Sequence, residues 1–433
     1  MWRRSFDLTG QRIVLIGVSC LGLACAGKGG PRLGSVTPAN AQLRSAATLM
    51  AAGRCDSAVV VARSGQLLAP ADALGPMVLG GCQEKDGRYD LAFATYTDFA
   101  TQHPQARGVS AIRAKALFAL RTQAEQTARQ ALASESTLTR LPPEPSTLAV
   151  LPVTISAGGD STFQPLSRGL AELITSDLAL IRTLRLLERV QIGALLDELK
   201  LGQSQRGDPN SAARVGRMLR AERMVQGVAS ITPDGPVRLT ASVVRGDGTV
   251  RSGAEANGTF RGLLDLEKQL VFSLAGQLGI QLTEAERQRI LRQGPRNLAA
   301  FLAYSQGLDA LARGDYRAAA AAFSAAVRAD PSFQEAQQQQ QAAEAAPAVV
   351  AGGDVATVLD AATAAQEPPS LAAPPPPTAG ALEATKNETS PSLGGVLTDN
   401  GAPTTTPELT PATKGINSVT QASGIIRIIF KRP

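Results

Sequence analysis

The sequence has one histidine, four cysteines and one tryptophan among 433 residues, and only 4% of its residues are aromatic. The histidine, His103, stands beside Pro104 in an expected linker between two helices, which gives a Ser-His-Asp triad poor support. A metal site built on histidine has equally little support. Acid pairs such as Asp197-Glu198 fall on a solvated helix face. We therefore predict no enzyme, no catalytic residue, no cofactor and no metal.

One loop has the position of an anion site. The segment SAGGDST, residues 156–162, follows an expected strand and precedes an expected helix, whose N-terminus could hold an anion. It lacks the lysine of a Walker loop and the glycine spacing of a dinucleotide-binding loop. An ordinary strand-to-helix turn accounts for the segment, and we assign no site to it.

The charge of the chain is low and evenly spread. The formal net charge is +6, and no run of lysine and arginine is interleaved with aromatic residues. We therefore expect no nucleic-acid partner. With 44% hydrophobic residues, the chain is apolar and long enough to form two or three globular units.

The N-terminus has the pattern of an export signal. A basic pair precedes an apolar run at residues 13–26, which is too short for a comfortable membrane span. We predict a signal peptide over residues 1–25. The segment LGLAC, residues 21–25, resembles a bacterial lipobox with Gly22 where leucine is preferred, and this resemblance implies that Cys25 is lipidated. A signal that is simply cleaved is the alternative.

Export would place Cys55 and Cys82 in an oxidising compartment. A pair of thiols in such a compartment usually forms a disulfide, and we predict a bridge between these two cysteines. Two buried free thiols that act as small apolar groups are the alternative.

A repeat of 34 residues runs through the N-terminal part of the chain. Three pairs of positions share this offset: Pro70 and Pro104, Gly53 and Gly87, and Ala58 and Ala92. Thirty-four residues is the period of the tetratricopeptide repeat, a pair of helices with small residues at the crossing and proline after the second helix. We predict a tetratricopeptide-like helical domain over residues 36–140.

A third copy lies at Ala300–Pro331. Its residues at the positions that the tetratricopeptide family uses are Gly307, Gly314, Tyr316, Ala319, Phe323, Ala326 and Pro331. Small residues at 307 and 319 would let two helices approach closely, and the two aromatic rings would fill the space between them. The glycine at 314 would make the turn.

The repeats allow two interpretations. They form a helical spacer with no ligand, or a concave surface that binds a peptide or protein segment. A single repeat buries too little surface to fold alone. We therefore expect the third repeat to dock on the middle domain, against a helix at residues 263–278 and its continuation to residue 294.

The periodicity changes at residues 146–282. The run TLAVLPVTI suits a buried strand, a helix is expected at 164–181, and a hairpin is expected around Gly246–Gly248. The segment from Leu184 to Ser204 divides into a short strand and an amphipathic helix, so its pattern serves packing and not chemistry. We predict a mixed sheet with helices packed on it.

This middle region resembles a known family. The segments LAVLPV, LSRGLAELITSDL, LRLLERVQIGALLDELKLG and AARVGRMLRAERMVQGVASI are similar to the curli assembly/transport (CsgG-type) lipoprotein family. The Glu-Arg pair that ends a strand in that family is Glu188-Arg189 here. The curli channel inserts two membrane hairpins per subunit, whereas only residues 232–236 separate two of the expected strands here. We therefore keep the fold and doubt the pore.

The C-terminal part has the composition of a disordered tail. Glutamine, alanine, proline, threonine and serine dominate from about residue 338 to 423, and we assign residues 346–433 to a disordered Pro/Ala/Thr-rich tail. The tail ends in a strand-like segment, residues 424–430, which could add to a sheet edge or simply end the chain.

These inferences combine into one expectation. The fold class is an α/β mixed-sheet middle domain at 146–282, flanked by all-α tetratricopeptide-like repeats at 36–140 and 283–345, with a disordered C-terminal tail. We expect a non-catalytic envelope lipoprotein that acts as a protein-protein interaction or assembly scaffold, lipid-anchored at the outer membrane facing the periplasm, or periplasmic. Its partners would be other envelope proteins and the membrane, and homo-oligomer formation stays open. An oligomeric secretion channel or channel accessory is the alternative.

Overall fold

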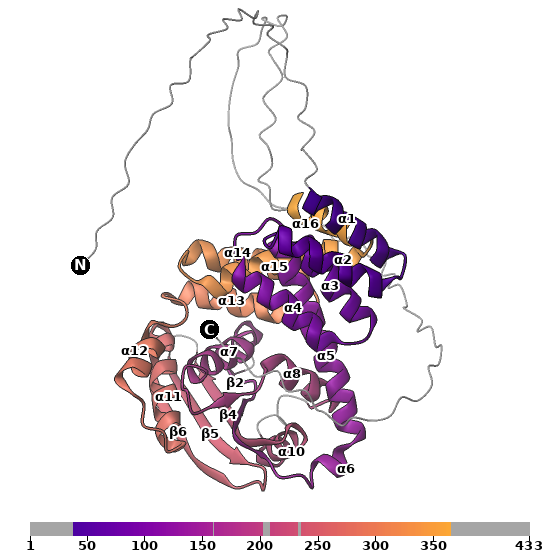
Figure 1. The fold of residues 1–433 in the computed structure, drawn as a ribbon. Helices are drawn as coiled ribbons and strands as arrows, with labels where there is room; N and C mark the ends of the chain where they lie inside the picture. The colour runs from indigo at the N-terminus through magenta and orange to yellow at the C-terminus, as the bar shows by residue number, and fades with distance from the viewer. Residues whose placement is uncertain (1–37, 159, 202–207, 233–234, 365–433) are drawn as a thin grey trace, which may run out of the picture.

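A computed structural model describes residues 38–158, 160–201, 208–232 and 235–364 (Figure 1). The predicted signal peptide, Cys25 and the segment at 424–430 lie outside the described residues. None of the helices within the described ranges is both long and apolar enough to cross a membrane.

The N-terminal part consists of helices that follow one another as antiparallel neighbours. Their bounds are α1 (Pro38–Ala51), α2 (Cys55–Leu68), α3 (Leu74–Lys85), α4 (Tyr89–Gln102), α5 (Val109–Ala133) and the short α6 (Glu135–Leu138). The turn between α1 and α2 and the turn between α3 and α4 contain Gly53 and Gly87, with φ of 77° and 73°. Gly314 has φ of 77° in a third turn of this kind. Glycine adopts this left-handed conformation without the steric penalty of a side chain.

The middle part contains a mixed sheet, as the sequence predicted. Its strands are β1 (Glu144–Val150), β2 (Thr154–Ser156), β3 (Arg185–Leu186), β4 (Ala221–Ile231), β5 (Pro236–Arg245) and β6 (Val250–Thr259). The strand order is β3-β1-β4-β5-β6, with β2 also paired to β4. Pairs among β1 to β4 are parallel, and β4-β5 and β5-β6 are antiparallel.

Helices pack on both faces of the sheet, and one side of β5 and β6 stays exposed at Arg238 and Glu255. On one face, α7 (Leu166–Leu178) and α11 (Leu263–Gln277) pack on buried residues of β1, β4, β5 and β6. On the other, α8 (Arg189–Glu198), α10 (Pro209–Leu219) and the second half of α5 share a core with β1 and β4. The described part of the segment Leu184–Ser204, which ends at Leu201, thus contains β3 and α8, and Ile192, Leu195 and Leu196 of α8 are buried.

The C-terminal helices fold back against the N-terminal ones. They are α12 (Glu284–Arg292), α13 (Leu298–Ala312), α14 (Tyr316–Ala329), α15 (Gln334–Ala351) and α16 (Val355–Ala364). In Figure 1 the orange helices lie among the indigo helices, and α15 and α16 both contact α5. The helices of the predicted regions 36–140 and 283–345 therefore flank the α/β domain in sequence and pack against one another as one helical layer.

The predicted start of the tail at residue 346 was wrong, because helices continue beyond this residue. Helix α15 continues to Ala351 and α16 follows it, with Ala345, Ala346, Val355 and Ala362 buried. The composition suggested disorder because alanine adds little to the average hydrophobicity of a segment. Alanine nevertheless has the highest helix propensity, and it packs without losing side-chain entropy, so an alanine-rich segment can form a packed helix. Residues from 365 onward lie outside the described part of the chain.

The third helix pair, α13 and α14, docks on a different helix from the one predicted. Its main apolar neighbour in the α/β domain is α7 and not α11. A Cβ built at Gly169 of α7 would collide with Ser305 of α13, and Phe301 of α13 is buried in the core of the sheet. An ion pair between Arg168 and Asp309, with a nitrogen to oxygen distance of 3.6 Å, joins the same two helices. Sequence order favoured α11 because α12 follows it directly, but α7 carries the glycine that permits close approach.

Candidate functional site

Helix α16 covers a surface formed by α1, α3 and the start of α5, which we name the α1–α3–α5 groove. The groove is lined by Arg44, Met50, Leu74, Gly81, Gly108 and Ala111. These residues come from α1, α3 and the start of α5, which alternate with α2 and α4 along the chain, and α3 contacts both α1 and α5. Both Met50 and Leu74 belong to the same hydrophobic cluster as Val355 and Val358 of α16. The groove is therefore filled by a segment of its own chain.

Small residues in the groove determine how closely α16 approaches. Gly108 caps the N-terminus of α5 with φ of 80°, and a Cβ built there would collide with Leu359 of α16. A Cβ built at Gly81 would lie 4.0 Å from Val355 Cγ1. Ala111 is fully buried in a cluster with Ala362. The groove thus accepts a helix with medium-sized apolar side chains in direct contact with its floor.

Helix α16 presents one apolar ridge to the groove. Val355, Val358, Leu359 and Ala362 have the spacing i, i+3, i+4, i+7 of a single helix face. Val355, Val358 and Ala362 are buried, and Leu359 is half-buried. Thr357 and Ala361 lie on the opposite, exposed side. This arrangement is the geometry of a helix bound in a groove.

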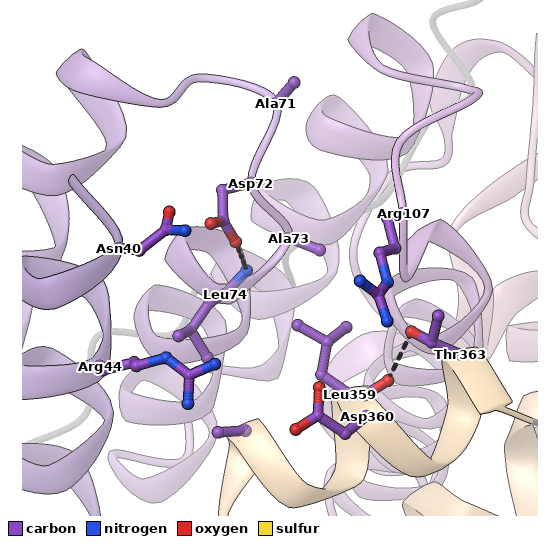
Figure 2. A pocket seen from close by; sticks show the side chains of 11 residues that line it. Asn40, Arg44, Ala71, Asp72, Ala73, Leu74, Arg107, Leu359, Asp360 and Thr363 are labelled. Atoms are coloured by element: carbon purple, nitrogen blue, oxygen red, sulfur yellow. Dashed lines mark hydrogen bonds between the residues drawn. The ribbon is translucent and has the colours of Figure 1, made fainter. Parts of the chain in front are cut away.

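A polar pocket remains at one side of this contact. It has a volume of about 390 Å³ and is lined by residues of α1, of the connection before α3, of the connection before α5, and of α16. Figure 2 shows Arg44 reaching in from α1 and Arg107 from the loop before α5, with Asp360 of α16 between them. Asp72 accepts a hydrogen bond from the Leu74 backbone N–H at 2.9 Å.

Three charged side chains that line this pocket form no ion pair within the described residues. Among the described residues, no ion pair within 4.0 Å includes Arg44, Arg107 or Asp360. All three side chains belong to exposed residues. Two guanidinium groups therefore line the pocket beside the apolar groove, and guanidinium groups bind carboxylates with two parallel hydrogen bonds.

Helix α5 connects the groove with the α/β domain. Its first half lines the groove, and its second half lies in the cluster that includes α8 and α10. Phe118 of α5 packs edge-to-face on Tyr316 of α14, with ring centroids 5.3 Å apart. Arg129 near the end of α5 forms an ion pair with Glu198 of α8 at 3.0 Å. A single helix of 25 residues thus belongs to both parts of the molecule.

The cysteines predicted to pair are joined by a disulfide in the structure. Cys55 begins α2 and Cys82 lies in α3, with their Cα atoms 5.5 Å apart. This distance is within the usual range for a bridge. The disulfide connects the first helix pair to the second, and Cys82 belongs to the same hydrophobic cluster as Val355 and Val358 of α16.

The predicted packing residues of the third helix pair lie together, but away from the groove. Gly307 faces the ring of Phe323, Ala319 is fully buried, and Tyr316 meets α5. Gly314 makes the turn, and Pro331 follows α14. The second pair repeats this contact, with Gly80 facing the ring of Tyr96. The pairs share these features, while their assignment to the tetratricopeptide family stays a prediction.

The Glu188-Arg189 pair, which carried part of the family resemblance, has a structural position. Arg189 at the start of α8 forms an ion pair with Glu172 of α7. Burial, reinforced by the negative charge of Glu172, raises the pKa of Glu188 to about 7. Glu188 also caps α8 by accepting the Val190 N–H at 3.5 Å. Arg189 joins α8 to α7 and is half-buried, and Glu188 is buried, so both residues have a structural role at this contact.

A second buried cluster lies between α7 and α11. Lys268 contacts both Asp177 and Glu267, and neither carboxylate side chain is accessible to solvent. Burial first, and then the charge of Asp177, raises the pKa of Glu267 to about 8. Within the described ranges, no three His, Cys, Asp or Glu side chains gather as a candidate metal site.

In the described part of the loop at residues 156–162, β2 ends at Ser156 and a 3-10 helix begins at Ser161, before α7. The Asp160 carboxylate accepts the Thr162 N–H at 2.8 Å. This backbone donor is therefore already used, and the negative charge beside it would repel a bound anion.

Sequence reasoning missed the groove, α16, and the Arg44 and Arg107 pair. The apolar spacing at 355–362 was the one signal that could have shown α16.

Comparison with known proteins gives a partial answer. No curated protein matches the chain. The family model for the curli production assembly/transport component CsgG matches residues 116–232, which run from the middle of α5 to the residue after β4. The match confirms the predicted CsgG-type middle domain and covers well under half of the chain. The middle of this protein is thus similar to a family of curli-related envelope components, and the helices that form most of the groove lie outside the match.

Proposed function

We propose that this protein is a non-catalytic scaffold of the bacterial cell envelope. In this proposal Cys25 carries the lipid anchor at the outer membrane, the domains face the periplasm, and the helical layer binds a segment of another envelope protein. The observation that carries the proposal is the position of α5. The family match begins inside this helix, and the other end of the same helix lines the α1–α3–α5 groove.

This arrangement would let the chain hold a partner next to its CsgG-type domain. Helix α5 contacts α4, α8, α15 and α16, so it is packed along most of its length and is a rigid connection. A segment bound in the groove would lie at a fixed distance from α8 and the sheet. Fixing two bodies in this way is what a scaffold contributes to an assembly.

A secretion channel, or a channel accessory related to curli export, is the second candidate, and the family similarity supports it. The connections between strands favour the scaffold instead. Only residues 232–235 separate β4 from β5, and only 246–249 separate β5 from β6. Membrane hairpins of roughly 9–11 residues per strand have no room in connections of this length. The exposed side of β5 and β6 also carries the ion pair between Arg238 and Glu255.

The test combines localisation with partner capture in the bacterium that makes the protein. A photo-cross-linking amino acid would replace Arg44 in the groove or, as a matched control, Arg317 on the exposed side of α14. We expect the protein to fractionate with membranes, and the groove position alone to capture an envelope protein that mass spectrometry identifies. A membrane-embedded, SDS-resistant ring of this chain that conducts ions would contradict the scaffold and establish the channel.

A further inference from the structure

We propose that α16 is an intramolecular occupant of the α1–α3–α5 groove, and that the groove binds a partner helix of the same surface chemistry once α16 leaves. The partner would carry apolar side chains at i, i+3, i+4 and i+7 and a carboxylate at i+5, as α16 does with Val355, Val358, Leu359, Ala362 and Asp360. The inference rests on the proposed function, since it names the ligand and the control of the docking surface assigned there.

The connection to α16 permits it to leave. Gly352 and Gly353, which join α15 to α16, have φ of 72° and 121° and are exposed. Helix α16 has only 10 residues. Isolated helices shorter than about 12–15 residues are marginal in water. The groove therefore supplies the order of α16. Release of the helix requires rotation of the backbone at the two glycines and the loss of its apolar contacts.

The contacts of α16 are almost entirely apolar. Within the described part of the chain, the only side-chain hydrogen bond of α16 is internal, from Thr363 Oγ1 to the Leu359 carbonyl at 2.7 Å. No ion pair or side-chain hydrogen bond that involves α16 crosses to α1, α3 or α5 in that part. Apolar packing is tolerant of sequence, so a different helix with the same ridge can occupy the same positions.

The pocket offers contacts through which a partner helix could bind more tightly than α16 does. Asp360 lies between Arg44 and Arg107 but forms no ion pair with either (Figure 2). A tethered segment has an effective concentration on the order of millimolar, so a free partner needs additional contacts to compete with it. A longer carboxylate side chain at the position of Asp360 would reach the guanidinium groups and supply such contacts.

The test uses the full mature chain and a fluorescent peptide with the sequence of residues 353–364. Leu359→Asp in the chain places a charge against Gly108 and should eject α16. Ala361→Asp adds the same charge on the exposed side of α16 and is the matched control. Fluorescence anisotropy measures peptide binding. We expect the Leu359→Asp chain to bind the peptide about tenfold more tightly than the wild type or the control, because the groove is then free in most molecules.

The pocket is tested with peptide variants on the Leu359→Asp chain. A peptide with Asp360→Glu should bind about threefold to fivefold more tightly than one with Asp360→Lys, which is the range expected of exposed ion pairs. Adding Arg44→Glu and Arg107→Glu to the chain should reverse this preference. An unchanged preference would overturn the assignment of the arginines.

Other results would overturn the proposal as a whole. Equal peptide binding by wild type and Leu359→Asp would show that α16 does not cover the binding surface. Absence of binding by a Leu359→Asp chain with unchanged circular dichroism would show that the groove does not bind helices. If that variant does not fold, Leu359→Ala replaces it, with the same criteria and a smaller expected difference.

Exchange between copies is a separate outcome. Light scattering that shows dimers, formed by α16 of one copy in the groove of another, would identify a second copy as the occupant and overturn the partner helix. The peptide assay needs only purified protein. Its failure would therefore leave the envelope localisation and partner capture unaffected, and a failure of those experiments would leave the peptide result standing.

Discussion

At the scale of single residues, the helical layer depends on contacts between a small residue and a large one. Gly307 faces Phe323, Gly80 faces Tyr96, and Gly108 faces Leu359. The sequence predicted the first contact because both residues lie within one 34-residue repeat. It could not predict the contact of Gly108, because Leu359 comes from a distant segment whose composition resembles a linker.

Replacement of Gly307 by leucine should destabilise the protein by about 1–3 kcal/mol, because the added side chain would overlap the buried Phe323 ring. Denaturant unfolding of the purified chain measures this free energy. Gly276→Leu is the matched control, since that glycine of α11 is exposed and has open space around it. Equal effects of the two substitutions would show that the helix pair is not packed as described.

The buried Glu267 gives the stability a pH dependence. Its pKa is raised to about 8 in the folded protein, whereas an unfolded glutamate titrates near 4.3. Between these values the unfolded chain has lost the proton and the folded chain still holds it, so stability must fall as the pH rises toward 8. We expect Glu267→Gln to flatten this part of the stability curve, whereas Glu284→Gln, at an exposed site on α12, should not. Parallel curves for wild type and Glu267→Gln between pH 5 and 8 would refute this assignment.

At the scale of elements, the sequence predicted most helices and strands, because their patterns are local. Helix α10 shows how local such a pattern is, because it begins at Pro209 directly after its cap Asp208, whose carboxylate accepts the Ser211 N–H at 3.0 Å. The hairpin of β5 and β6 turns at the predicted glycines. The order of the strands in the sheet could not be predicted from the sequence, because neighbouring parallel strands such as β1 and β4 are far apart in the chain.

The disulfide is a property of two elements, since it joins α2 to α3. Its sequence separation is 27 residues, and a bridge that closes a loop of this size should stabilise the fold by about 3 kcal/mol in the chain-entropy model. We expect Cys55→Ser with Cys82→Ser to lower the free energy of unfolding by about this amount, and reduction of the wild type to have the same effect. Thiol titration provides the check, because two free thiols at these positions in exported protein would rule the bridge out.

At the scale of the whole molecule, the two ends of the described chain lie side by side (Figure 1). Helices α15 and α16 pack on α5, and α13 packs on α7, so the helical layer is closed by segments from both sides of the α/β domain. Repeat analysis could find the helix pairs but not this closure, because a repeat specifies contacts with its neighbours in sequence only. The same closure places α16 in the groove.

The contact between α7 and α13 should make the helical layer and the α/β domain unfold together. Gly169 of α7 has no room for a side chain, because Ser305 and Phe301 of α13 occupy the space. Gly169→Leu should force these helices apart and lower the free energy of unfolding by roughly 1–3 kcal/mol. Gly193→Leu on α8, where the space is open, is the control. Hydrogen exchange followed by mass spectrometry should show faster exchange in both α7 and the α13–α14 pair for Gly169→Leu. Faster exchange in α7 alone would mean that the helix pair is stable without the sheet. The helical layer and the α/β domain would then be linked by the covalent chain and not by packing between α7 and α13.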